Sequence, residues 1–94
     1  MIVEYTTALE KKVRKMTDKI AIKRLLDIVF LLKQAKSLKE IPNVLPIKGA
    51  AGLYRISIGD YRLIIEPIKS KVTIILLIDY RKRNEKTYKG INIA

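Results

Sequence analysis

YRISIGDYRLII, residues 54–65, alternates polar and apolar side chains like a β-hairpin, and it decides the fold. Gly59-Asp60 at its centre is a favoured two-residue turn, because glycine tolerates the positive φ that such turns need. A two-residue turn fixes the register, since the residue numbers of facing partners then sum to a constant. We therefore expect Ile58 to face Tyr61 and Arg55 to face Ile64.

The two faces of this hairpin differ in chemistry, because successive side chains of a strand point to opposite sides. One face is apolar and aromatic and collects Tyr54, Ile56, Ile58, Tyr61, Leu63 and Ile65. The other face carries Arg55, Ser57, Arg62 and Ile64. On this second face the two arginines are diagonal neighbours. The first face should pack in the core, which leaves the arginine face for solvent or for an anionic ligand.

Two amphipathic helices are expected before the hairpin. The segment from Thr7 to Glu10 has the sequence of a capping box and should begin a short helix. Its apolar face holds Leu9, Val13 and Met16. Thr17-Asp18 caps a second helix over residues 19–35. The apolar positions of that helix recur at helical spacing and are Ile22, Leu25, Leu26, Val29, Phe30 and Leu32.

The remaining segments suggest strands and connections. Residues 1–6 alternate weakly and predict a short first strand. Residues 37–52 contain two prolines and two glycines and predict an irregular connection. Residues 67–70 read as a turn, and residues 72–78 are a nearly unbroken apolar run, typical of a central strand that is buried on both faces. We expect the backbone to leave the sheet in the charged residues 79–83.

These elements together predict an α+β protein with a single domain over residues 1–94. Its N-terminal helical hairpin packs on a twisted antiparallel sheet of about four strands. The opposite face of that sheet is then the surface that is free to bind a ligand.

The composition limits the classes of function. Twenty Lys and Arg against nine Asp and Glu give a net charge of +11, which favours nucleic acid, an acidic membrane surface or an acidic protein as partner. The absence of cysteine and histidine excludes disulfides and thiolate chemistry and makes zinc improbable. The start of the chain has no apolar stretch of signal-peptide length. We expect a soluble, cytoplasmic protein without metal or cofactor, whose amphipathic helices serve the core rather than a membrane.

The arginine pattern suits a phosphodiester. Arg55 and Arg62 can hold non-bridging phosphate oxygens through paired N–H donors, and Arg81 can close the site from a third strand. If the nucleophile is the 2′-hydroxyl of RNA, in-line positioning and charge stabilisation supply much of the catalysis without a metal. Arginine is too basic to accept the proton, so the free protein should be slow and a large RNA-containing partner should orient the substrate. The alternative is that these arginines form an ordinary solvated face and a charged strand end.

The order of elements, with LYRISIGDYRLII, an apolar strand and DYRKRNEKTYK, resembles the RelE/ParE superfamily of bacterial toxin–antitoxin systems. The most specific segment is residues 53–63. The resemblance implies a toxin that cleaves messenger RNA in the ribosomal A site by metal-independent 2′-OH attack, and whose activity is blocked by a cognate antitoxin. It assigns catalytic roles to Arg55, Arg62, Arg81 and Tyr88, the last of which stacks on the substrate or exchanges protons with it.

The resemblance also suggests further RNA contacts, and it leaves two alternatives open. We expect RNA to be contacted by Lys48, Ser57, Lys82, Arg83 and Lys86. Ser57 stands where RelE-like nucleases often place a second basic residue, and Tyr80 stands where many relatives have histidine or lysine. One alternative is a ParE-like inhibitor of DNA gyrase, and the other is a noncatalytic module that binds the ribosome or RNA.

Overall fold

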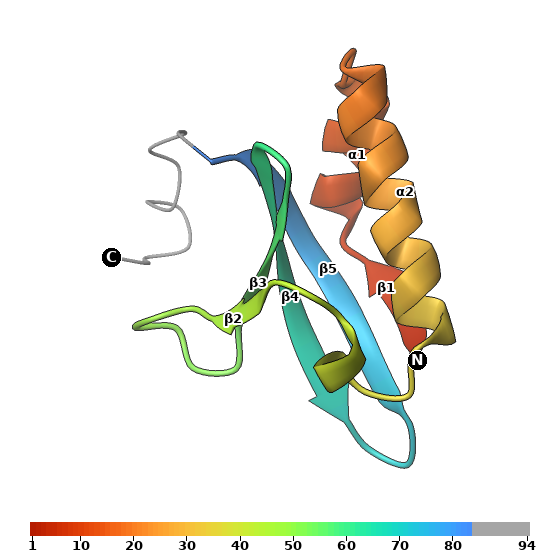
Figure 1. Cartoon of the computed structure of the whole chain (residues 1–94), viewed down its shortest axis with the longest axis vertical. Coiled ribbons are helices and arrows are strands. Elements are labelled where there is room, and N and C mark those ends of the chain that lie inside the picture. The colour runs from red at the N-terminus through yellow and green to blue at the C-terminus, as the bar shows by residue number, and fades with distance from the viewer. Residues whose placement is uncertain (84–94) are drawn as a thin grey trace.

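A computed structural model of the chain describes residues 1–83. The elements follow one another as β1 (Ile2–Tyr5), α1 (Thr7–Lys15), α2 (Lys19–Gln34), the 3₁₀ helix η1 (Leu38–Glu40), β2 (Val44–Pro46), β3 (Tyr54–Ile58), β4 (Tyr61–Lys69) and β5 (Thr73–Lys82). The described strands form a five-stranded sheet with the order β1-β5-β4-β3-β2. Both α-helices lie on the same side of this sheet (Figure 1). The predicted α+β class is confirmed, with five strands in place of about four.

The central hairpin has the predicted register. Ile58 pairs with Tyr61 and Arg55 pairs with Ile64, and Gly59 adopts a φ of 58° in the turn. The apolar face of the hairpin packs against the helices, where Ile56 is fully buried. The hairpin therefore divides the sheet into a covered face and an arginine face, as the alternation predicted.

The chain continues as strand where a turn was predicted at residues 67–70. β4 runs to Lys69 and pairs with β5, and the chain reverses only at residues 70–72. Pro67 is tolerated because β3 pairs with β4 only as far as Ile65, so no strand of the described chain pairs with β4 on that side at the proline. The turn prediction was wrong because it took the proline as a break.

β5 is longer than its apolar run. The sequence predicted that the backbone leaves the sheet at residues 79–83, but β5 continues to Lys82 and remains paired with β4. The register shifts between Ile64 and Ile65, whose partners are Asp79 and Leu77, so that Ile78 is skipped as a β-bulge. The parallel pairing of β1 with residues 74–77 of β5 also departs from the predicted antiparallel sheet.

The helix caps are set by tertiary contacts as well as by sequence. α1 is capped by Thr6, not by Thr7, because the Thr6 hydroxyl accepts a hydrogen bond from the Leu9 N–H at 3.1 Å and also donates to the Ile78 carbonyl at 3.2 Å. α2 begins as predicted, with the Asp18 carboxylate accepting from the Ala21 N–H at 3.0 Å. The hydrogen bond from the Thr6 hydroxyl to the Ile78 carbonyl of β5 explains why Thr6, and not Thr7, caps α1.

Two of the apolar positions predicted to face the core from α2 are exposed instead. Leu25 and Leu32 are buried as predicted, but Leu26 is 60% exposed and Phe30 is 62% exposed. Each residue of a helix is rotated by about 100° from the last, so these two side chains lie outside the strip that the sheet covers. Within residues 1–83, no helix is long and apolar enough to cross a membrane.

Candidate functional site

Three arginines from three adjacent strands share the uncovered face of the sheet. Arg62 of β4 is the direct partner of Arg81 of β5 and of Ser57 of β3. Arg55 lies two residues before Ser57 and so projects to the same side. Direct cross-strand partners have Cα atoms about 4.5–5.5 Å apart, so Arg62 and Arg81 are immediate neighbours, and Arg55 is the diagonal neighbour of Arg62 on β3. The predicted grouping of these residues on one face is confirmed.

The β-bulge at Ile78 is what brings Arg81 to this face. Ile75 and Leu77 of β5 point into the core, so uninterrupted alternation would also turn Arg81 toward the helices. Because Ile78 is skipped, Tyr80 takes the next core position and Arg81 falls beside Arg62. The bulge thus re-aims a basic side chain, as bulges near functional sites often do.

The arginine face is more enclosed than an ordinary solvated strand surface. The Arg81 side chain is only 16% exposed, and Arg55 and Arg62 are partly buried. The Nε atom of Arg55 and the Nη1 atom of Arg81 are buried, and neither makes a hydrogen bond to a group in the described part of the chain. A buried donor without an acceptor is costly, so these groups favour an anion that brings acceptors to them.

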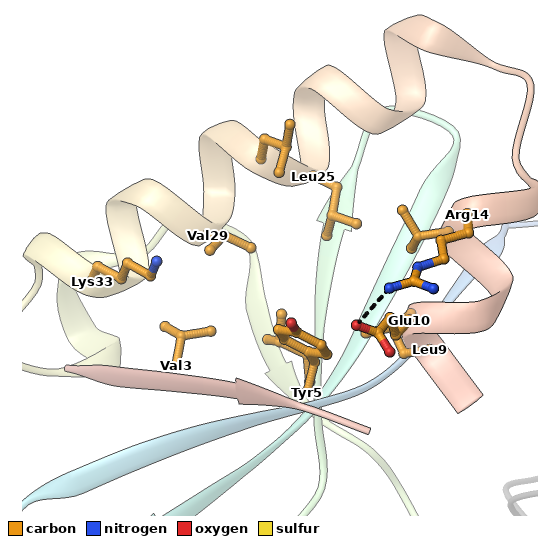
Figure 2. Close-up of a pocket in the computed structure, with 11 residues that line it drawn as sticks. Val3, Tyr5, Leu9, Glu10, Arg14, Leu25, Val29 and Lys33 are labelled. Carbon is orange, nitrogen blue, oxygen red and sulfur yellow. Dashed lines mark ion pairs between the residues drawn. The ribbon is translucent and has the colours of Figure 1, made fainter. Parts of the chain in front are cut away.

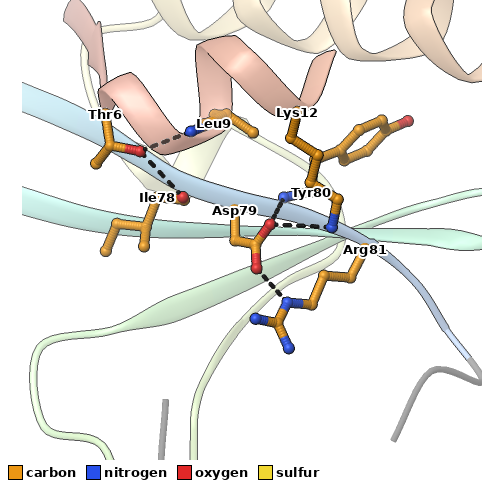
Figure 3. Close-up of polar contacts among 7 residues, drawn as sticks. All are labelled: Thr6, Leu9, Lys12, Ile78, Asp79, Tyr80 and Arg81. Carbon is orange, nitrogen blue, oxygen red and sulfur yellow. Dashed lines mark hydrogen bonds and ion pairs between the residues drawn. The ribbon is translucent and has the colours of Figure 1, made fainter. Parts of the chain in front are cut away.

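Asp79 connects this face to α1. Its Oδ1 accepts hydrogen bonds from Lys12 Nζ at 3.2 Å and from the Tyr80 N–H at 2.8 Å, and its Oδ2 accepts from Arg81 Nε (Figure 3). Burial alone would raise the pKa of Asp79, but the Arg81 hydrogen bond and the charges of Lys12 and Arg81 outweigh it and lower this pKa. The carboxylate is therefore charged at neutral pH.

Tyr80 does not belong to the arginine face. Its side chain is fully buried and points to the helix side of the sheet (Figure 3). The hydroxyl donates to the Ala21 carbonyl at 2.8 Å, and the ring stacks on Tyr61 with 4.7 Å between the ring centroids. Burial, together with the neighbouring Tyr61, raises the pKa of Tyr80 to about 12. Tyr80 is therefore a core residue and does not contribute to the arginine face.

The remaining predicted site residues are less closely grouped. Ser57 lies exposed on the arginine face, whereas Lys48 lies in an exposed loop after β2. Lys82 pairs with Tyr61 and so belongs to the opposite face, and the Arg83 N–H donates to the Asp60 carbonyl. The structure does not bring Lys48 or Lys82 to the three arginines. Lys86 and Tyr88 lie outside the described residues.

Sequence reasoning missed Asp79 and Lys12 as members of this site. Asp79 carried a usable signal, because it lies two residues before Arg81 and shares its face in any regular strand. Lys12 carried none, since its contact with Asp79 joins residues 67 positions apart in the chain. Only the packing of α1 beside the end of β5 brings it there.

A second surface lies on the helix side of the molecule. β1, α1 and α2 enclose an apolar groove of about 330 Å³ (Figure 2). It is lined by Val3, Tyr5, Leu9, Glu10, Val13, Arg14, Leu25, Leu26, Val29, Lys33 and Leu77. Glu10 and Arg14 form an ion pair of 3.4 Å at this groove, whereas Lys33 makes no ion pair with the described residues. The groove is therefore mainly apolar and carries a net positive charge.

The fold is similar to those of solved toxins. RelE in an archaeal RelE–RelB complex from Pyrococcus horikoshii OT3 superposes with a TM-score of 0.69 at 23% identity, covering 89% of this chain and 96% of that one. A RelB–RelE antitoxin–toxin complex from Methanococcus jannaschii gives a TM-score of 0.69 at 23% identity, with 94% and 93% covered. A YoeB/ParE toxin from Agrobacterium tumefaciens gives 0.64 at 20% identity, with 87% and 98% covered.

A comparison of sequences identifies the family. No curated protein matches the chain significantly. The family model described as the ParE toxin of the type II toxin–antitoxin system parDE, however, matches residues 3–85, which is most of the chain. The match includes both helices, the central hairpin and the whole of β5. The chain therefore belongs to the ParE toxin family of type II toxin–antitoxin systems.

Proposed function

We propose that this toxin is a ribosome-dependent endoribonuclease that cleaves messenger RNA in the A site. The observation that carries the proposal is the alignment of Arg55, Arg62 and Arg81 on one face of three adjacent strands. In the proposed reaction the 2′-oxygen of a ribose attacks the adjacent phosphorus, and the bond to the 5′-oxygen of the next nucleotide breaks. The products are a cyclic phosphate and a free 5′-hydroxyl.

Each arginine has a role in this reaction. Arg62 and Arg81 are direct cross-strand partners, so their planar guanidinium groups can hold the two non-bridging oxygens of one phosphate. Arg55 adds positive charge from β3 as negative charge develops on the phosphorane. The partial burial of these side chains strengthens such interactions, because the effective dielectric constant is lower than in water.

The described residues offer few groups that could accept or donate the proton in this reaction. The chain contains no histidine, and the pKa of Tyr80 is raised to about 12 by burial on the opposite face. We therefore expect slow cleavage by the free protein and activation by the ribosome, which orients the mRNA. Tyr88 is proposed to engage a base or the proton path. Weaker RNA contacts are proposed for Ser57, Arg83 and Lys86, and contacts away from the scissile phosphate are proposed for Lys48 and Lys82, which lie apart from the three arginines.

The partner that restrains the toxin is proposed to be a cognate antitoxin that occupies the apolar groove. Structures of similar fold were solved as toxin–antitoxin complexes. The groove fits an amphipathic segment whose apolar side chains cover Val29 and Leu26 and whose carboxylates approach Lys33. Charge complementarity favours an acidic segment, because the toxin carries a net charge of +11.

A second candidate function is inhibition of DNA gyrase without RNA cleavage. One observation favours it: the matching family model is that of the ParE toxin. In this case the arginine face would bind a protein rather than a phosphodiester.

Induction of the toxin in bacteria, with mapping of the 5′ ends of cellular transcripts, separates these functions. The nuclease should produce cuts within translated regions, in frame with the codons. Arg62→Ala and Arg81→Ala should each reduce cleavage by about a hundredfold or more and relieve growth inhibition, because each removes a donor to the phosphate. Arg14→Ala is the matched control, since that side chain is 75% exposed and lies on α1.

The other outcomes identify the alternatives. A DNA-damage response without transcript cuts would support gyrase inhibition. RNA binding without cuts would support a noncatalytic module. Equal cleavage of purified RNA with and without ribosomes would contradict the proposed dependence on the ribosome.

A further inference from the structure

We propose that Asp79 is a positioning residue, which holds Arg81 in the orientation that binds the phosphate and anchors it to α1 through Lys12. This inference rests on the proposed function, because it concerns the same phosphate site. Asp79 need not touch the substrate; it acts through the guanidinium of its neighbour.

The contacts of Asp79 fix the carboxylate from three directions. Oδ1 accepts from Lys12 Nζ at 3.2 Å, which comes from α1, and from the Tyr80 N–H at 2.8 Å, which belongs to β5 itself. Oδ2 accepts from Arg81 Nε (Figure 3). A carboxylate with both oxygens engaged cannot rotate without breaking a contact, so it provides a rigid support for Arg81.

The support is needed at this position in the sheet. Arg62 and Arg81 are direct cross-strand partners, and like charges placed directly opposite each other are destabilising. Without a partner, Arg81 would turn away from Arg62. Asp79 binds Arg81 through Nε, and Nη1 of the same guanidinium makes no hydrogen bond within the described residues and so remains for another acceptor. In this way the arginines remain together before a phosphate arrives.

The open edge of β5 explains how Lys12 reaches the site. β1 pairs with β5 only as far as Leu77, so no strand within residues 1–83 pairs with that side of β5 from Ile78 onward. The Asp79 side chain satisfies the N–H of Tyr80 at this edge, and α1 follows directly after β1 and lies against β5. Lys12 therefore reaches around the edge of the sheet to a carboxylate on its other face.

The direction in which RNA affinity changes when Asp79 is neutralised distinguishes a positioning role from a simple effect of charge. Removal of a carboxylate from an anion-binding face should tighten RNA binding if only Coulomb attraction matters. If Asp79 positions Arg81, its removal should weaken binding instead. Glu66 provides the matched control, because it lies on β4 two residues beyond Ile64, on the same face, and makes no ion pair with the described residues.

The experiment compares Asp79→Asn with Glu66→Gln in the full chain. Binding to a 2′-O-methyl RNA oligonucleotide, which cannot be cleaved by 2′-OH attack, is measured at fixed low salt. We expect Glu66→Gln to bind as tightly as the parent protein or more tightly, and Asp79→Asn to bind about five to twenty times more weakly, because a charge-assisted hydrogen bond is lost. Binding by Asp79→Asn that equals or exceeds the parent affinity would overturn the inference.

A spectroscopic readout and a double variant exclude general damage to the fold. The Arg81 Nε–H resonance, assigned from its absence in Arg81→Lys, should be protected from exchange in the parent and in Glu66→Gln, and exposed in Asp79→Asn. Asp79→Asn combined with Arg81→Lys should bind RNA no more weakly than Arg81→Lys alone, since Asp79 acts only through Arg81. Additive losses would indicate a structural role and would contradict positioning.

The design separates this inference from the nuclease proposal. If the parent protein never cleaves mRNA but the two carboxylate variants shift affinity in opposite directions, the nuclease proposal fails and the role of Asp79 in anion binding stands. If the parent cleaves mRNA on ribosomes and Asp79→Asn cleaves equally fast, the role of Asp79 is refuted and the nuclease proposal stands.

Discussion

The hydroxyl of Tyr80 joins β5 to α2 across the core. It donates to the Ala21 carbonyl at 2.8 Å, and the ring is fully buried against Tyr61. A buried phenol is satisfied by such a bond as long as it stays protonated, and burial raises its pKa to about 12. Tyr80 therefore stabilises the packing of helix on sheet, immediately beside the site residue Arg81 in the sequence.

Tyr80→Phe should lower the free energy of unfolding by about 1 kcal/mol, the usual contribution of one buried hydrogen bond. The pKa of Tyr80 is higher in the folded state than the value of about 10 in unfolded chains, so its stabilising effect is present below pH ~10 and is lost as the pH rises toward 12. Tyr80→Phe should not show this part of the loss of stability at alkaline pH.

Urea unfolding at neutral pH and thermal unfolding at a series of alkaline pH values measure both effects. Tyr5→Phe is the control, since Tyr5 is 58% exposed. Equal stability of the parent and Tyr80→Phe throughout this range would contradict the prediction, whereas toxicity should be the same in all three proteins.

At the same scale, the sequence could assign some site residues and not others. Arg55 and Arg62 follow from the two-residue turn, because it fixes both register and face. The face of Arg81 does not follow from alternation. Residues 72–78 are apolar on both sides of the strand, so the sequence does not show which of them face the core, and the bulge at Ile78 then reverses the faces of the residues that follow. The role of Lys12 depends on a contact between distant segments and has no local signal.

Among the elements, the β3–β4 turn lies directly against α2. Gly59 has a φ of 58°, and a Cβ added there would collide with the Arg24 guanidinium. Glycine is therefore required twice, by the left-handed backbone and by the close approach of a helical side chain. This contact fixes the tip of the hairpin that carries Arg55 and Arg62.

Gly59→Ala should destabilise the protein by about 1–2 kcal/mol, because a left-handed backbone is unfavourable for alanine and because the Arg24 side chain must move. Gly49→Ala is the matched control, since Gly49 has a φ of 83° with open space around its Cβ position and should show only the backbone cost. Addition of Arg24→Ala should recover part of the loss in Gly59→Ala and none in Gly49→Ala. Urea denaturation of the single and double variants measures these changes in stability. Identical effects of Arg24→Ala in the Gly59→Ala and Gly49→Ala proteins would argue against the contact between Gly59 and Arg24.

One exposed apolar residue of α2, Leu26, belongs to the groove beside β1. Leu26 lines that groove and is 60% exposed, so the free toxin has no structural need for it there. The sequence predicted that Leu26 lies in the core. Helical spacing alone does not show whether an apolar face of a helix is covered by the sheet or by another protein. The parallel pairing of β1 was hidden for a similar reason, since it depends on the distant β5.

Leu26→Asp should weaken the complex with the cognate antitoxin by about tenfold or more, because it places a charge in an apolar interface and repels acidic side chains. The fold and the toxicity of the free protein should not change. Ile20→Asp is the control, as Ile20 is 65% exposed on the same helix and outside the groove. Calorimetric titration with the antitoxin gives the affinities; equal weakening by both variants would place the antitoxin elsewhere.

For the whole molecule, the net charge of +11 attracts polyanions over long distances, and the proposed RNA substrate is one of them. In the proposed function the arginine face adds specific phosphate contacts to this general field, while the groove on the helix side is mainly apolar. The two surfaces lie on opposite sides of the sheet. An antitoxin in the groove can therefore reach the arginines only if it also wraps around an edge of the sheet.

RNA affinity should fall steeply as salt is added, because each phosphate contact releases bound counterions. In a plot of log affinity against log salt concentration, Arg62→Ala should reduce the slope by about 0.7, the value for one contact with single-stranded RNA. Lys23→Ala should leave the slope unchanged, because Lys23 pairs with Asp27 on the exposed side of α2. Titrations at several salt concentrations measure the slopes, and equal reductions in both variants would mean that binding is purely nonspecific.

The order of the strands also determines when the toxin can become active during its synthesis. β1 emerges first from the ribosome, but its partner β5 is the last strand within residues 1–83, and Arg81 arrives with it. Long-range pairing of this kind delays folding until the distant segment is available. A nascent chain that stops before β5 carries Arg55 and Arg62 but lacks the strand that completes the site, so prematurely terminated products should be harmless to the cell that makes them.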